Sequence, residues 1–115
     1  MDKYTYDDVM DAATELAEAF PRRTNPMISD GCVYTDKYRK RHCIAGQILI
    51  NLGTDLCPTY RNFANRGTDI AHVNGVFELF EEPAVALLAK LQQTADGVGT
   101  PVPWGKAVAH VLNRG

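Results

Sequence analysis

Apolar residues recur at helical spacing in four stretches of the chain. The first covers residues 6–20, where apolar positions at i, i+3, i+4 and i+7 predict an amphipathic helix with one buried stripe. Thr5 followed by Asp8 is typical of a capping box at its start, and Pro21 is expected to end it. The stripe consists of Tyr6, Val9, Met10, Ala13, Leu16, Ala17 and Phe20.

The second stretch predicts a helix over residues 44–52, because Ile44, Ile48 and Leu52 fall on one face. Gly53 is well placed as the residue that terminates it. Ala45 and Gly46 carry small side chains, so another element could approach this helix closely.

The third and fourth helices lie in the last third of the chain. Pro83 is expected to open the third, and Gly97 to end it. The third helix carries a stripe of Ala84, Leu87, Leu88, Leu91 and Ala95. After a short linker, the last helix presents one apolar face made of Trp104, Ala107, Val108 and Val111.

The remaining segments give weaker signals. Residues 32–34 and 42–43 predict two short strands of a hairpin, joined by a turn over 35–41. A short helix is expected from Pro58 to about residue 63. Residues 70–80 fit either a helix or an Asn-Gly hairpin, and we favour a turn at 74–75 followed by a short helix from about Phe77.

Together these elements predict a mainly α single domain over residues 1–115. We expect a bundle of four to five helices, with a short β-hairpin between the first two and the helices at 44–52 and 83–96 at the centre. The apolar fraction of 45% is ordinary for a globular protein. The longest apolar run is shorter than the roughly 18 residues of a membrane span, and the acidic start lacks the apolar core of a secretory signal. We therefore expect no membrane association and a cytoplasmic location.

The net charge is only −2, but the charges are unevenly distributed. Acids dominate residues 1–20 and bases dominate residues 22–41. The two groups could be solvated faces that pair with one another, or a bipolar surface that steers a charged partner. The acids are Asp2, Asp7, Asp8, Asp11, Glu15 and Glu18, and the bases are Arg22, Arg23, Lys37, Arg39, Lys40 and Arg41.

Three cysteines and a histidine are candidate metal ligands. Cys32, Cys43 and Cys57 are separated by ten and thirteen residues, and His42 adjoins Cys43. Structural zinc sites usually bring their ligands in close pairs such as C-x2-C, and the chain has none. We expect no metal, no cofactor and no disulfide, with the cysteines as free thiols in a reducing cytosol.

The basic turn, residues 37–41, is the strongest candidate for a binding surface. It combines clustered positive charge with aromatic rings that could anchor a contact, and it suits either a protein partner or the phosphates and bases of a nucleic acid. No catalytic motif accompanies it, and we expect no small-molecule substrate. The predicted partner-binding residues are Tyr34, Lys37, Tyr38, Arg39, Lys40 and Arg41.

Two sequence blocks resemble a family. Residues 43–53, CIAGQILINLG, are similar to a CIxGxxLxxLG pattern. Gln93, Asp96-Gly97 and residues 103–108, PWGKAV, are similar to a QxxQDxGxPWGxAV ending. Both patterns occur in small uncharacterised proteins of actinobacteria and their phages. The linker at 97–103 is longer than in that pattern, and the basic turn replaces a shorter turn containing glycine.

The resemblance implies a phage or actinobacterial cytoplasmic setting, and it brings no catalytic residues. With the absence of a catalytic motif, it leads us to expect a non-enzymatic accessory protein that is phage-encoded and binds a host protein. The alternative is a nucleic-acid-binding regulator that uses residues 37–41.

Overall fold

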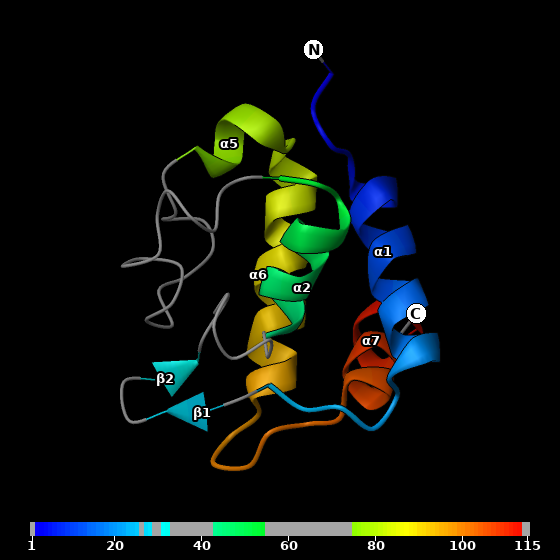
Figure 1. Cartoon of the computed structure of the whole chain (residues 1–115), viewed down its shortest axis with the longest axis vertical. Coiled ribbons are helices and arrows are strands. Elements are labelled where there is room, and N and C mark those ends of the chain that lie inside the picture. Colours follow the sequence, from blue (N-terminus) through cyan, green and yellow to red (C-terminus); the bar gives the residue numbers. More distant parts are fainter. Residues whose placement is uncertain (1, 26, 29–30, 33–42, 55–74, 114–115) are drawn as a thin grey trace.

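Helix α6 contacts every other helix that the structure describes. The computed structural model describes residues 2–25, 27–28, 31–32, 43–54 and 75–113. These residues form five helices, which confirms the expectation of a mainly helical fold (Figure 1). The helices are α1 (Tyr6–Ala19), α2 (Ile44–Asn51), α5 (Val76–Leu79), α6 (Glu82–Asp96) and α7 (Trp104–Asn113).

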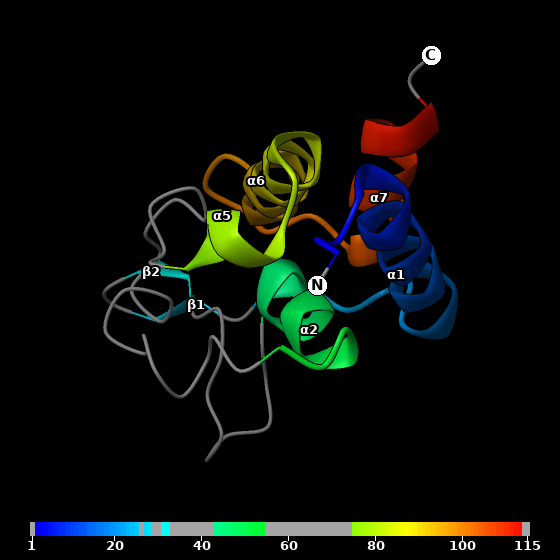
Figure 2. The same ribbon diagram turned by 90° about the horizontal axis from the view of Figure 1, so that it is seen from above.

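The helices pack around one shared core. α6 contacts each of the other four, and α1 also packs against α2 and α7. Figure 2 looks along the bundle and shows α1, α2, α6 and α7 around a common centre. The helix that follows Pro83 therefore has the central place in the packing that is predicted for it, while the helix at 44–52, also predicted to be central, packs against α1 and α6.

The predicted apolar stripes point into this core. Met10 and Leu52 are only partly buried, and Tyr6 and Phe20, at the two ends of the α1 stripe, are 40% and 42% exposed. The other large residues expected in the core are buried: Val9, Leu16, Ile48, Leu88, Leu91 and Trp104.

Local signals set the ends of the helices. The backbone N–H of Asp8 donates to Thr5 Oγ1 at 3.2 Å, and that of Thr5 donates to Asp8 Oδ2 at 2.9 Å, which completes the predicted capping box. At the end of α2, Gly53 has φ +80°. The N–H of Gly53 and that of Thr54 donate to the carbonyls of Ile50 and Leu49, so this helix ends in a Schellman motif.

The predicted hairpin is not seen in the described residues. Instead, β1 (Met27–Ile28) and β2 (Gly31–Cys32) pair antiparallel, with Met27 opposite Cys32. Cys43, expected in the second strand, is the N-cap residue of α2. The strand prediction was wrong there because it relied on local residue type, whereas Cys43 is buried against the bundle. Residues 33–42 lie outside the described part of the chain.

The ambiguous segment at 70–80 is described from Gly75 onward. Gly75 has φ +89° and precedes α5, which agrees with a turn followed by a short helix. Residues 70–74 and the helix expected from Pro58 lie outside the described residues. The helix and the Asn-Gly hairpin therefore both stay predictions for residues 70–74.

Tyr4, which precedes α1, connects the C-terminal end of α5 to the end of α2. The N–H of Tyr4 donates to Leu79 O at 2.8 Å, and the N–H of Glu81 donates to Tyr4 O at 2.9 Å. The Tyr4 hydroxyl donates to Leu52 O at 2.5 Å, and the centroid of its ring lies 5.1 Å from that of Phe80.

Among the helices the structure describes, none is long and apolar enough to cross a membrane.

Candidate functional site

The predicted partner-binding residues Tyr34, Lys37, Tyr38, Arg39, Lys40 and Arg41 all lie outside the described residues. The structure therefore describes the point where this segment joins the bundle. That point is Cys43 and the first turn of α2, and it is surrounded by polar side chains from elsewhere in the chain.

Two carboxamides are buried beside the first turn of α2. Asn25, in the loop after α1, is 2% exposed, and Gln92, on α6, is 4% exposed. A buried amide is costly unless it is hydrogen-bonded, and within the described residues no buried side-chain polar atom lacks a partner. The hydrogen-bond partners of these two amides within the protein therefore explain why they can be buried.

Asn25 and Gln92 cap α2 from outside the helix. The first N–H groups of a helix have no partner within it, and the side chain of the N-cap residue Cys43 does not cap them. The N–H of Ile44 donates to Asn25 Oδ1 at 2.8 Å, and that of Ala45 donates to Gln92 Oε1 at 3.1 Å. Two segments distant in sequence thus complete the start of this helix.

Asp96 and Trp104 complete the arrangement. Asn25 Nδ2 donates to Asp96 Oδ1 at 2.8 Å, and Gln92 Nε2 donates to the same oxygen at 3.5 Å. The indole Nε1–H of Trp104 donates to Asn25 Oδ1 at 2.9 Å. We call Asn25, Gln92, Asp96 and Trp104 the cap cluster. Because both amide nitrogens face a carboxylate, both amide oxygens are directed toward α2.

The electrostatics of the cap cluster centre on Asp96. Burial raises the pKa of Asp96 from its ordinary value of 3.8, and the hydrogen bond from Asn25 opposes that rise. The carboxylate is the last residue of α6 and only partly buried. It orients two amides at the cost of partial desolvation.

The loop after α1 also holds the start of α7. The N–H of Trp104 donates to Arg23 O at 2.7 Å, and the N–H of Gly105 donates to Pro21 O at 2.9 Å. A Cβ at Gly105 would lie 3.0 Å from Pro21 Cβ and from Pro21 O, so a larger residue would push the two segments apart. The Arg23 guanidinium lies 4.0 Å from the Phe20 ring centroid and 5.3 Å from that of Trp104.

Cys43 is disulfide-bonded and fully buried. The expectation of free thiols was therefore wrong for this residue, because spacing in the sequence does not show which cysteines the fold brings together. The other cysteines of the chain are Cys32 and Cys57. The side chain that completes the bond lies outside the described ones.

Within the described residues, no group of three or more His, Cys, Asp or Glu side chains is placed to hold a metal ion. A cysteine in a disulfide also has no thiolate to offer a metal. The amide and indole N–H groups of the cap cluster donate to acceptors within the protein, so the cluster serves to hold the helices together.

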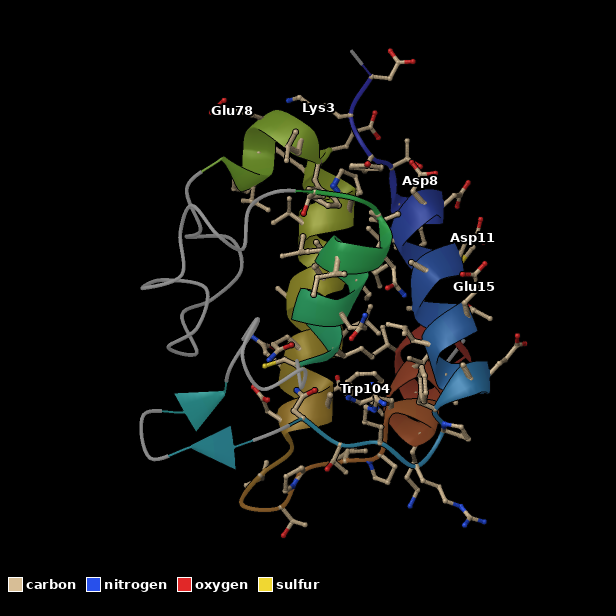
Figure 3. All side chains as sticks on the ribbon, in the orientation of Figure 1. Lys3, Asp8, Asp11, Glu15, Glu78 and Trp104 are labelled. Carbon is tan, nitrogen blue, oxygen red and sulfur yellow. The ribbon has the colours of Figure 1, made fainter. Side chains whose placement is uncertain are left out.

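The α1 acids form an exposed stripe on the outside of the bundle. Figure 3 shows Asp8, Asp11 and Glu15 directed away from the other helices. Asp7 and Glu18 are exposed as well. The acidic half of the predicted bipolar surface is therefore accessible.

Comparisons with protein-family models, with curated proteins and with solved structures found no match.

Sequence reasoning missed most of the cap cluster. No pattern in the sequence singles out Asn25, and the resemblance uses Gln93, which is exposed, instead of its buried neighbour Gln92. A signal was present, because Gln92 lies one turn after Leu88 and one turn before Asp96, on the apolar side of α6. Its polarity at a position facing the core was the clue.

Replacing Gln92 tests the capping role. Gln92→Ala should lower the free energy of unfolding by about 1–3 kcal/mol, because the buried N–H of Ala45 loses its acceptor. Gln93→Ala, next to it on the same helix and exposed, should change it by less than about 0.5 kcal/mol. Denaturant unfolding of both variants measures the difference, and equal effects would contradict the assignment.

The raised pKa of Asp96 predicts a pH dependence. The folded protein binds this proton more tightly than the unfolded chain, so the contribution of Asp96 to stability is greatest below 3.8. It falls as the pH rises from there through the folded-state pKa. Asp96→Asn keeps an acceptor oxygen without the charge.

The free energy of unfolding of Asp96→Asn minus that of wild type should therefore increase from strong acid to neutral pH, because wild type loses stability as Asp96 ionises and the variant does not. Denaturant unfolding across that range measures the trend. A difference that stays constant or declines would show that Asp96 is not the desolvated carboxylate described above.

Proposed function

We propose that this protein is a non-enzymatic, phage-encoded accessory protein that binds a host protein in the bacterial cytoplasm. The proposed binding surface is the basic turn, residues 37–41, with Tyr34 beside it in the sequence. The resemblance to small actinobacterial and phage proteins supports the origin. The structure of the adjoining residues supports the use of the surface.

The observation that carries the proposal is the firm attachment of Cys43, which follows Arg41 by two residues. Cys43 is buried and disulfide-bonded, and the next two N–H groups are held by Asn25 and Gln92. A binding segment attached to a rigid support loses less conformational freedom when it binds. The bundle therefore provides such a support at one end of the basic turn.

The charge distribution supports a protein partner over nucleic acid. The acidic stripe of α1 would repel phosphates, whereas a protein surface can carry patches of both signs. Asp7, Asp11 and Glu15 are exposed along that helix and remain available to a partner. A bipolar surface would orient the partner during its approach.

Charge reversal tests the surface. Arg39→Glu with Arg41→Glu should slow association with the captured host protein at least roughly tenfold, because the attraction that steers the encounter is lost. The helical content should not change. Association rates of purified partners, after capture from actinobacterial lysate, give the measurement.

A matched variant with Asp11→Lys and Glu15→Lys controls for the size of the charge change. It changes the α1 acids and leaves the basic turn intact, so it should slow association less. A folded basic-turn variant that captures the same proteins at an unchanged rate would contradict the proposal and direct attention to the α1 acids. Capture that disappears after nuclease treatment would favour the alternative of a nucleic-acid-binding regulator, whose affinity falls with salt at a log–log slope of about −0.9 per duplex phosphate.

A further inference from the structure

The loop that follows α1 anchors the backbone of an exposed arginine. The N–H of Arg23 donates to Phe20 O at 3.2 Å, and its carbonyl accepts from the N–H of Trp104 at 2.7 Å. Two residues later, Asn25 is buried in the cap cluster. The backbone of Arg23 is therefore attached both to the end of α1 and to the start of α7.

The side chain of Arg23 is held by two aromatic rings. Its guanidinium carbon lies 4.0 Å from the centroid of the Phe20 ring and 5.3 Å from that of the Trp104 ring. A guanidinium over an aromatic ring is attracted by the ring face, and its N–H groups still need acceptors. Arg23 is exposed, and its side chain has no hydrogen-bond or ion-pair partner among the described residues. The N–H groups of a positioned arginine therefore remain available.

We propose that Arg23 and Phe20 form a docking site for a protein segment that carries a carboxylate beside an apolar side chain. The fork of N–H groups on arginine matches the two oxygens of a carboxylate. The Phe20 ring is 42% exposed and offers an apolar contact beside that charge. Arginine and aromatic residues are enriched at protein–protein interfaces. The site lies apart from residues 37–41 in the sequence, and the inference does not depend on the proposed function.

The positions of the two side chains before binding favour a contact of this kind. An exposed arginine ordinarily loses rotamer freedom when a partner immobilises it. Here the contacts with Phe20 and Trp104 already restrict the guanidinium, so less freedom is lost on binding. Arg22, the neighbouring residue, is exposed as well and adds positive charge to the same loop.

The neighbouring charges favour a protein segment over a nucleic acid. Phosphates also suit a guanidinium, but in a nucleic acid they form a continuous line of negative charge. Glu15 and Glu18 are exposed on the last two turns of α1, which leads directly into this loop. A polyanion would be repelled by these carboxylates, whereas a segment with a single carboxylate is repelled far less.

NMR titration of the full chain with a short peptide tests the proposal. The probe is a Ser-Leu-Glu-Leu-Ser peptide with blocked ends, and the control peptide carries Gln in place of Glu. The Glu peptide should shift the backbone amide signal of Thr24, beside Arg23, in a saturable way. The Gln peptide should bind at least about tenfold more weakly, because hydrogen bonds to a charged acceptor are lost.

Two single substitutions and one double variant locate the site. Arg23→Gln should weaken binding of the Glu peptide at least about tenfold. Lys3→Gln removes the same charge at the opposite end of the bundle from Trp104 (Figure 3), so the affinity should stay within about twofold. The Thr24 shift should also persist when Arg39→Glu and Arg41→Glu are introduced, which separates this site from the basic turn.

Equal affinity of wild type for the Glu and Gln peptides, or no Thr24 shift with either, would overturn the proposal without requiring any variant to fold. Loss of the Thr24 shift in the Arg39→Glu, Arg41→Glu protein would also overturn it, because the basic turn would then bind the peptide. A hexathymidine oligonucleotide that shifts Thr24 at a lower concentration than the Glu peptide does would assign the site to nucleic acid instead.

Discussion

The start of α2 is buried, and its backbone N–H groups must find acceptors there. Buried N–H groups without partners cost about as much as a lost hydrogen bond, and the first turn of a helix has none of its own. Here Asn25 supplies an acceptor to Ile44, and Gln92 supplies one to Ala45. The rest of the arrangement at this end of the bundle follows from how these two amides are held.

Asp96 and Trp104 hold them, and in doing so they join four elements. Asp96 accepts from both amides, and the Trp104 indole donates to Asn25. The loop that carries Asn25 also accepts from the first N–H groups of α7 through Pro21 and Arg23. The sequence blocks at 43–53 and 93–108 therefore meet here, since Cys43–Ala45 belongs to the first and Asp96 and Trp104 belong to the second.

Sequence reasoning succeeded where the determinant is local. The α1 capping box, the Schellman end at Gly53 and the α7 face from Trp104 follow from residues within one or two turns of each other. It failed where the determinant is distant. Tyr4 bonds to Leu52 across 48 residues, and Asn25 bonds to Trp104 across 79, so no local pattern could specify either contact.

The candidate binding surface could be predicted only as a cluster of charge. Residues 37–41 lie outside the described part of the chain, and the structure supplies their attachment at Cys43. The cysteine chemistry was predicted incorrectly for the same reason as the distant hydrogen bonds. Pairing of Cys43 depends on the fold, and spacing alone favoured free thiols.

Native-state hydrogen exchange at Ile44 and Ala45 tests the central claim most directly. The first amides of an ordinary helix exchange quickly because they have no partner within it. If Asn25 and Gln92 cap α2 from outside, these two amides should be protected nearly as strongly as Leu88 and Leu91 in the α6 core. Rapid exchange at Ile44 and Ala45, with the α6 amides still protected, would contradict the account.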